Sequence, residues 1–430
     1  MSFCRLILLA AVLVLLAPQA DAPAASQDRP GSDQPVLIKT VVLMRHGVRA
    51  PTQAPETLQE WSGKPWPVWP AARGELTERG ATLVSLFWQA EGARLRAQGL
   101  LPPGPLNRSD VLVLADLDQR TRSTALALAR GLAPDDNVRV RVRNIPAPDP
   151  LFHPVKARLC ALNPAAVAAD ITPARINALA GSLAPQLDEL GDILGPAAPA
   201  WCARYRLTAP CRVTDAPSNL LLTQENHNVN LSGGLPAASS AAEIFLLEYG
   251  QWNQNAAWGA LDAARLGNLL RVHTDTFNLI NRAPSVAAAR GSALLEAMLQ
   301  SLDGSHPDQA FNTARLIVFV GHDTNLANIG ALLNLHWQIP GYPADDIPPA
   351  SMLALNLWQT PQGLFVSADY AAQSPETLHN PDQAGPPLRQ ALSWTADAPA
   401  QTLMPLRNLL TRVESRLRRD CIPRWPEQNS

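Results

Sequence analysis

The sequence is poor in lysine, in charge and in long apolar segments. Only three of its 35 basic residues are lysines, 17% of the 430 positions are charged, and 37 acidic residues bring the net charge to -2. This balance excludes the broad basic surface of a typical nucleic-acid binder. After residue 25 no run of eighteen apolar residues occurs, so we expect no membrane association of the mature chain. A 47% apolar content indicates a globular chain, long enough for one large domain or two smaller ones.

The N-terminus has the pattern of a secretory signal peptide. Arg5 precedes twelve apolar residues at 6–17, which are too few to span a bilayer. Two A-x-A-like sites, at 20–22 and 22–24, are candidates for cleavage. We therefore expect a signal peptide over residues 1–22, cleaved between residues 20 and 25, and a periplasmic or secreted protein. An uncleaved anchor is the alternative.

Cysteine is scarce, and its pattern favours disulfides. Without the signal peptide four of five cysteines remain, an even number that favours disulfides over a metal site in an exported chain. Three connectivities are possible. Cys202 and Cys211 lie nine apart around Pro210 and close easily into a loop, which would leave Cys160 with Cys421. Neither spacing suits zinc, and the eight histidines form no H-E-x-x-H motif, so we expect no metal.

Apolar runs alternate with helical periodicity along most of the chain. We expect strands over residues 36–44, 111–115, 138–142, 316–320, 352–357 and 364–367. We expect helices over residues 120–132, 242–249, 261–281, 286–302, 325–333 and 403–417. Strands that alternate with helices favour an α/β layered fold. Between the strands lies an Ala- and Pro-rich stretch with a helix-like run at 171–194. The sequence thus predicts an α/β domain over 35–150 and 260–430, with a mostly helical subdomain inserted over 151–259.

The first strand leads directly into the motif R-H-G-V-R-A-P at residues 45–51. Ligands of open α/β sheets bind at the carboxyl ends of the strands. Arg45 and Arg49 can each offer a planar fork to an oxyanion, and Gly47 lets the backbone approach a ligand closely. The two permanent cations should lower the pKa of His46. A neutral imidazole beside a guanidinium clamp is suited to nucleophilic attack on phosphorus.

The second strand leads into D-L-D-Q-R at residues 116–120. Arg120 falls at the start of the next helix, where free N–H groups and the helix dipole also favour an anion. We interpret Asp116 and Asp118 as residues that orient the arginines.

The third strand leads into G-H-D-T at residues 321–324, again at a helix start. His322 can donate a hydrogen bond to an oxyanion, and Asp323 is the carboxyl best placed to protonate a leaving group. A single strand-end histidine is usually structural. Three charged motifs at one sheet edge, however, favour a phosphate site.

These motifs resemble those of the histidine acid phosphatases, the branch of the histidine phosphatase superfamily marked by R-H-G-x-R-x-P and a later H-D. The similarity is greatest to the enterobacterial periplasmic phytases and acid phosphatases, and it includes residues 66–70, 149–160 and 243–247. The resemblance implies a phosphoglycerate-mutase-like, three-layer α/β sheet domain, a helical subdomain over the site and no cofactor. It implies a nucleophile that becomes phosphohistidine, His46, a proton donor, Asp323, and four phosphate ligands: Arg45, Arg49, Arg120 and His322.

The resemblance also bears on the disulfides and the substrate pocket. It implies the pairs Cys160–Cys421 and Cys202–Cys211, although this chain has no cysteines for the family's other disulfides. The candidate pocket residues are Thr52, Gln53, Glu243, His273 and Thr324. Gln53 stands where the phytases have lysine, and Ser240 replaces a methionine. The lost cation weakens the case for a hexa-anionic substrate. Gly47, which is asparagine in the glucose-1-phosphatases, favours the phytases. Helix-face packing is the alternative role for Glu243 and His273.

The sequence therefore predicts a monomeric, exported acid phosphatase that acts on small phosphate monoesters, phytate among them. Activity should be highest at acidic pH, because Asp323 must carry a proton. One alternative is a periplasmic sugar phosphatase similar to the glucose-1-phosphatases. Phosphotransfer of the mutase type is another, although the signal peptide and the H-D pair argue against it. A non-catalytic receptor for phosphorylated ligands would have no use for both His46 and Asp323.

Overall fold

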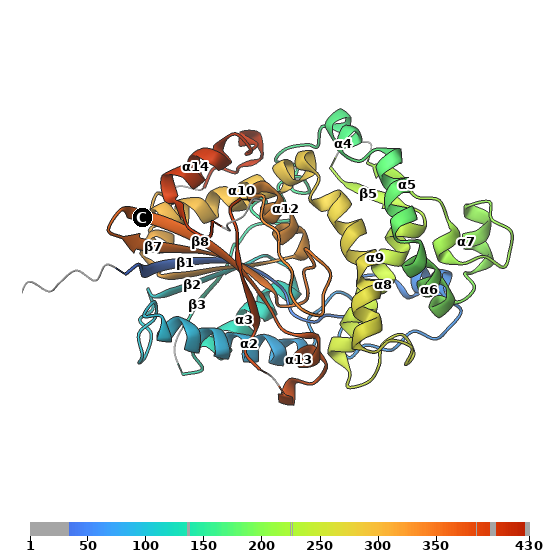
Figure 1. The fold of residues 1–430 in the computed structure, drawn as a ribbon, viewed down its shortest axis with the longest axis horizontal. Helices are drawn as coiled ribbons and strands as arrows, with labels where there is room; N and C mark the ends of the chain where they lie inside the picture. Colours follow the sequence, from blue (N-terminus) through green and yellow to red (C-terminus); the bar gives the residue numbers. More distant parts are fainter. Residues whose placement is uncertain are drawn as a thin grey trace, which may run out of the picture. The chain divides into compact units, whose positions relative to one another are not determined.

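A mixed β-sheet lies at the centre of the computed structural model (Figure 1). The strand order is β10-β8-β7-β1-β6-β2-β3, and β9 pairs with β8. The structure describes residues 34–135, 138–223, 225, 227–383, 385–395 and 401–425, so the predicted signal peptide lies outside it. Residues 35–430 form one compact unit. Within the described ranges, no helix is both long and apolar enough to cross a membrane.

All six predicted strands are present in this sheet. The bounds are β1 (Val36–Arg45), β2 (Val111–Ala115), β3 (Arg139–Val142), β6 (Leu316–Gly321), β7 (Met352–Thr360), β8 (Gly363–Ala372), β9 (Leu388–Leu392) and β10 (Met404–Pro405). β1, β6, β2 and β3 are parallel, whereas β7 pairs antiparallel with β1. The parallel strands place the carboxyl ends of β1, β2 and β6 at one sheet edge. β9, β10 and a separate hairpin, β4 (Asn219–Leu222) with β5 (Val229–Ser232), were not predicted.

Helices cover both faces of the sheet, which gives the three layers that were predicted. Successive residues of β1 point to opposite faces. Val41 and Leu43 belong to one core cluster, together with residues of α10 (Pro284–Asp303) and α12 (Asp323–Leu333). Val42 and Met44 belong to the other, together with residues of α2 (Glu78–Ala97) and α3 (Gln119–Leu132). In Figure 1, α2 and α3 lie on one side of the sheet and α10 and α12 on the other.

Most predicted helices are present, and one long helix was missed. Besides α3, α10 and α12, the structure contains α8 (Gly234–Gln251), α9 (Ala263–Asn281) and α14 (Leu406–Glu414) at predicted positions. The missed helix is α2, because its buried face includes Gly80, Glu91 and Gly92 and so lacks a continuous apolar period. The short helices α1 (Pro55–Trp61), α11 (Gln309–Thr313) and α13 (Pro375–His379) were also not predicted.

Helices are the main regular elements of the stretch predicted as an insertion. It contains α4 (Pro164–Asp170), α5 (Pro173–Ser182), α6 (Ala184–Leu194), α7 (Pro199–Arg204) and the β4–β5 hairpin. The helix-like run at 171–194 is two helices, because Leu183 leaves helical geometry and Pro185 lies in the first turn of α6. Both disulfides implied by the resemblance are present, Cys160–Cys421 and Cys202–Cys211. In Figure 1 these helices lie beside α8 and α9, away from the sheet.

Candidate active site

The three charged motifs meet at one edge of the sheet. The register pairs Arg45 with Gly321 and Ala115 with Val320, so the strands end at the same level. The backbone N–H of His46 donates to the carbonyl of Gly321 at 3.1 Å. Parallel pairing thus places Arg45 and Gly321, 276 positions apart in the sequence, side by side, as the sequence predicted.

His46 is buried, and its ring is held in one orientation. Nδ1 lies 2.9 Å from the carbonyl oxygen of Gly47. Because a carbonyl only accepts, Nδ1 carries the hydrogen, and in the neutral ring Nε2 keeps a lone pair. Burial and then the charges of Arg45, Arg49 and Arg120 lower the pKa of His46 well below its ordinary value. The neutral imidazole expected from the sequence follows.

Three arginines surround this ring, and each has an unused donor. In the described part of the chain, the Nε atoms of Arg45, Arg49 and Arg120 are buried and have no hydrogen-bond partner. Buried guanidinium N–H groups without partners are costly, and an oxyanion is the ligand that satisfies them best. This arrangement favours an anion-binding site around His46.

Two carboxylates balance the arginines. Glu243, from α8, lies 2.5 Å from Arg45 Nη2 and 3.1 Å from Arg49 Nη2 through the same oxygen. Asp323, the first residue of α12, lies 3.1 Å from Arg45 Nη2. Burial alone would raise the pKa of Asp323, but the charges of Arg45 and Arg49 outweigh it and lower that pKa. Asp323 is therefore anionic in the ligand-free site, whereas the sequence-based mechanism requires a protonated carboxyl.

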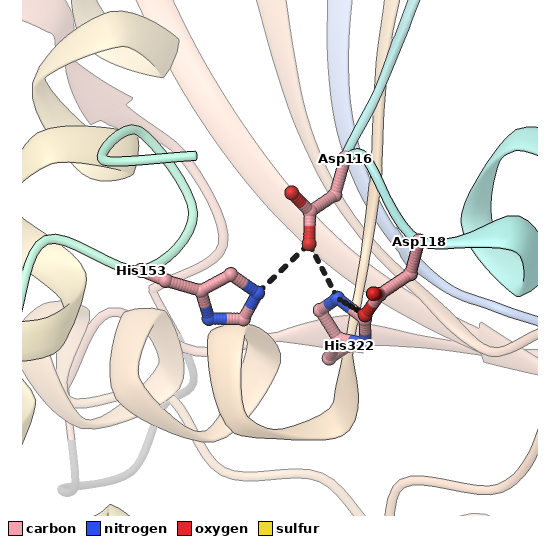
Figure 2. Close-up of side chains that lie close together, drawn as sticks. All are labelled: Asp116, Asp118, His153 and His322. Carbon is pink, nitrogen blue, oxygen red and sulfur yellow. Dashed lines mark hydrogen bonds and ion pairs between the residues drawn. The ribbon is translucent and has the colours of Figure 1, made fainter. Parts of the chain in front are cut away.

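His322 forms a network that the sequence only partly predicted (Figure 2). His322 Nε2 lies 2.6 Å from Asp116 Oδ2, and His153 Nε2 lies 2.8 Å from the same oxygen. Arg120 Nη2 lies 3.3 Å from His322 Nδ1 and 2.6 Å from Asp118 Oδ2. Asp118 thus orients an arginine as predicted. For Asp116 that interpretation was wrong, because its carboxylate contacts two imidazoles.

The same cluster, Asp116, Asp118, His153 and His322, consists of residue types that can ligate a metal. Two ligands of a tetrahedral zinc ion, each bound at about 2.1 Å, would lie about 3.4 Å apart. The observed separations of 2.6 and 2.8 Å from the imidazoles to Asp116 are those of hydrogen bonds. The Arg120 guanidinium already supplies a positive charge to this cluster. The geometry thus favours a hydrogen-bonded network.

A cavity of about 330 Å³ opens beside these residues. Its lining includes five of the predicted site and pocket residues, together with Ser240: Arg49, Glu243, His273, Asp323 and Thr324. It also includes three cationic or titratable residues that were not predicted, His153, Lys156 and Arg290. The first two fall in the 149–160 stretch that resembles the phosphatases, but no motif marked them.

Thr52 and Gln53 lie apart from this group. Gln53 lines a second, more apolar cavity of about 630 Å³, together with Trp66 and Trp69. Thr52 is exposed and lies near Gly74, whose carbonyl is 3.5 Å from Arg120 Nη1. Both residues flank the phosphate site without joining the cavity of Glu243 and His273.

Gly47 has a packing role that the sequence interpretation missed. A Cβ atom at this position would lie 2.9 Å from the carbonyl oxygen of Gly80 and 2.8 Å from Val84 Cγ2. The glycine therefore lets the motif loop pack directly against α2. This contact gives the glycine a structural role that does not depend on a ligand.

Comparison with known proteins identifies the family. A sequence profile described as the histidine phosphatase superfamily (branch 2) matches residues 36–368. The chain belongs to this branch. It is 36% identical over 363 residues to the phytase AppA of Escherichia coli, a match that covers 81% of this chain and 82% of that protein. It is 25% identical over 375 residues to a glucose-1-phosphatase of Providencia rettgeri, covering 85% and 87% of the two chains.

Solved structures of branch 2 members agree with this assignment. The structure of Hafnia alvei phytase in complex with myo-inositol hexakis sulphate superimposes with a TM-score of 0.83 at 32% identity. The match covers 92% of this chain and all of that one. The fold is therefore shared with this phytase over 92% of the chain.

Proposed function

We propose that this protein is an acid phosphomonoesterase that works through a phosphohistidine at His46. One observation carries this proposal: the Nδ1–H of His46 donates to the Gly47 carbonyl, which leaves the Nε2 lone pair free among three arginines with unused donors. A nucleophile without its proton beside an anion-binding site is what phosphoryl transfer requires.

The residues divide the reaction between them. Arg45, Arg49, Arg120 and His322 hold the phosphate, and His46 Nε2 attacks phosphorus. The ester P–O bond breaks, and Asp323 gives its proton to the leaving oxygen. Water then attacks the phosphohistidine and passes a proton to the Asp323 carboxylate. The P–N bond breaks, and phosphate leaves with both groups restored.

We propose phytate as one of the substrates. The chain is 36% and 32% identical to two phytases and 25% identical to a glucose-1-phosphatase. Lys156, His273 and Arg290 line the cavity beside the phosphate site, where they can face further phosphate groups. Gln53, which supplies no charge, is the feature that favours the runner-up, a sugar phosphatase.

The reaction class is tested with a chromogenic aryl phosphate in the presence of EDTA. We expect hydrolysis to persist, and acid quench with ³²P-labelled substrate to trap label on the protein. His46→Ala should abolish both signals, while His336→Ala, at an exposed histidine, should retain them. Full activity of the His46 variant would show that the mechanism is wrong. If the folded wild-type protein binds phosphate but does not hydrolyse the aryl phosphate, the result would favour a non-catalytic receptor for phosphorylated ligands.

The substrate class is tested by comparing kcat/KM for phytate, glucose-1-phosphate and the aryl phosphate. A phytase should prefer phytate. Gln53→Lys restores the cation beside the site and should raise kcat/KM for phytate by about three- to fivefold, the effect of one exposed charge contact, without changing that for the aryl ester. A preference for glucose-1-phosphate would favour the sugar phosphatase.

The proposal extends to export and organisation. We propose removal of residues 1–22 during export to the periplasm, a monomeric mature chain, and a helical subdomain over 151–259. The pair of disulfides supports an oxidising compartment. Intact mass of protein from a periplasmic extract and light scattering of the purified chain test the first two statements. Limited proteolysis near the two subdomain boundaries tests the third.

A further inference from the structure

His153 lies in a turn that is anchored on both sides. Its backbone N–H donates to the carbonyl of Asp149 at 2.8 Å, and the buried Asp149 carboxylate pairs with Arg143 at 2.7 Å. The neighbouring Phe152 is buried, and its carbonyl accepts from the Asn325 side chain at 2.9 Å. These contacts join the turn to the start of α12. The turn that carries His153 is therefore fixed to the start of α12, directly after His322 in the chain.

The ring of His153 is directed at the catalytic network rather than at solvent. Only 16% of its side chain is exposed, and its centroid lies 5.0 Å from that of His322. Figure 2 shows both imidazoles with a ring nitrogen directed at Asp116. Both contacts are to the single oxygen Oδ2, at 2.8 Å from His153 Nε2 and 2.6 Å from His322 Nε2.

These two contacts define where the imidazole hydrogens lie. Burial alone would raise the pKa of Asp116, but its hydrogen bonds with His153 and His322 outweigh burial and lower that pKa. The group is a carboxylate, which only accepts, so Nε2 of each histidine must carry a hydrogen. The Nδ1 atom of His322 is then the nitrogen on the side of Arg120, 3.3 Å from Nη2. In the neutral ring this nitrogen has the lone pair and accepts from Arg120. It can donate to a bound phosphate when His322 carries a second proton, a charged form that the Asp116 carboxylate beside Nε2 stabilises.

His153 also determines how Asp116 is oriented. Asp116 Oδ1 accepts the backbone N–H of Leu117 at 2.8 Å, and Oδ2 accepts from both histidines. Without His153, His322 would be the remaining hydrogen-bond partner of Oδ2 among the described residues. Asp118 Oδ2, 3.6 Å from His322 Nε2, offers a competing acceptor on a side chain that is 46% exposed. His153 therefore keeps His322 paired with the buried carboxylate of Asp116 instead of the more exposed one of Asp118.

We propose that His153 is a positioning residue for the phosphate site: through Asp116 it holds His322 with its hydrogen on Nε2 and its Nδ1 toward Arg120 and the substrate. This inference rests on the proposed phosphatase function. It adds a residue that no motif marks, and it assigns a definite tautomer to His322. His153 acts through Asp116 and does not need to touch the substrate.

Two substitutions separate the hydrogen bond from the bulk of the ring. His153→Gln places an amide N–H close to the position of Nε2 and keeps the donor to Asp116. His153→Phe keeps a ring beside His322 but removes the donor. With the aryl phosphate, we expect kcat/KM to fall about tenfold in the Phe variant, as for the loss of one hydrogen bond to a charged group. The Gln variant should stay within about threefold of wild type.

The tautomer is read directly from long-range ¹H–¹⁵N spectra of protein labelled with ¹⁵N-histidine, with His322→Gln used for assignment. In wild type, we expect the His322 hydrogen on Nε2. In the Phe variant this signal should shift or broaden, and in the Gln variant it should be retained. His336→Gln, at the exposed histidine, is the matched control and should change neither the spectrum of His322 nor the rate.

The outcomes distinguish this inference from the proposed function. If wild type hydrolyses no phosphomonoester, the function is wrong, while the spectra still test the tautomer. If wild type is active and His322 carries its hydrogen on Nδ1, the inference is overturned even if the Phe variant fails to fold. Equal kcat/KM in the Phe variant and wild type would also overturn it. If kcat/KM falls equally in the Phe and Gln variants while their thermal unfolding is unchanged, the hydrogen bond from His153 to Asp116 is not what matters.

Discussion

Anion binding at this site should be coupled to protonation of Asp323. In the ligand-free site Asp323 lies 3.1 Å from Arg45, and the charges of Arg45 and Arg49 keep its pKa low. An oxyanion held by the same guanidinium groups neutralises them and adds its own negative charge nearby. Both effects raise the pKa of Asp323. Binding should therefore take up a proton, and affinity should increase as pH falls.

The size of this coupling follows from the geometry. An oxygen bound to Arg45 at a normal distance would lie about 5 Å from the Asp323 carboxylate, and one negative charge there costs about 3 kcal/mol at an effective dielectric constant near 20. This energy raises the pKa of Asp323 by about 2, into the mildly acidic range. Affinity should then increase about two- to threefold between pH 6 and pH 4. The proton for the leaving group is thus acquired with the substrate.

Calorimetry with sulfate measures this coupling, because sulfate stays a dianion over the whole range. Wild type should bind more tightly at pH 4 than at pH 6, with proton uptake revealed by buffers of different ionisation enthalpy. Asp323→Asn should bind more tightly than wild type at pH 6, by about tenfold or more, because it removes a repelling charge. Its affinity should depend little on pH. The exposed Asp188→Asn is the control. If the Asp323→Asn variant takes up as many protons on binding as wild type does, the reasoning is refuted. Another residue would then be the group that is protonated.

Three further predictions concern stability, measured by urea unfolding. Burial raises the pKa of Glu248 from 4.5 to about 7. Between these two pH values the folded protein keeps a proton on Glu248 that the unfolded chain has lost. The free energy of unfolding therefore falls as the pH rises from 4.5 to 7. Glu248→Gln should remove this loss and stabilise the protein by about 2–3 kcal/mol at pH 8, with little change at pH 4; an equal effect at both pH values would contradict the titration. Gly47→Ala should destabilise the protein by about 1–3 kcal/mol, because its Cβ meets backbone, whereas Gly63→Ala, with open space around it, should be neutral. Replacing Cys160 and Cys421 with serine removes a disulfide that links positions 261 residues apart and should lower the free energy of unfolding by about 5 kcal/mol. Removing the Cys202–Cys211 disulfide, which closes a nine-residue loop, should cost about half as much. Equal losses would argue against the chain-entropy explanation.

Fully buried strands were the part of the fold that sequence predicted best. β2 and β6 are continuous apolar runs that are buried on both faces, and β1 is a longer run interrupted only by Lys39 and Thr40. The half-exposed β9 and the two-residue β10 have no such pattern. These short strands form only because β8 offers an edge for pairing, which is a tertiary effect.

The site could be predicted where strand pairing alone brings residues together. Parallel strands end at a common edge, so the neighbourhood of His46, Arg120 and His322 followed from three apolar runs. Glu243 reaches Arg45 from the middle of α8, and its position depends on how that helix packs. Only the family resemblance indicated it. His153 depends on a turn held to α12, and neither periodicity nor motif reported that contact.

The charges of the site give a physical reason for the predicted preference for acid in a nearly neutral chain. Arg45 and Arg49 are buried, and Glu243 and Asp323 offset their charge in the ligand-free state. Substrate phosphate must compete with these carboxylates for the same guanidinium groups. Protonation of Asp323 removes one competitor and loads the proton that the leaving oxygen needs. Acid preference is therefore a property of phosphate binding as well as of the proton donor, and for this reason the variant Asp323→Asn should lose turnover while it gains affinity for sulfate.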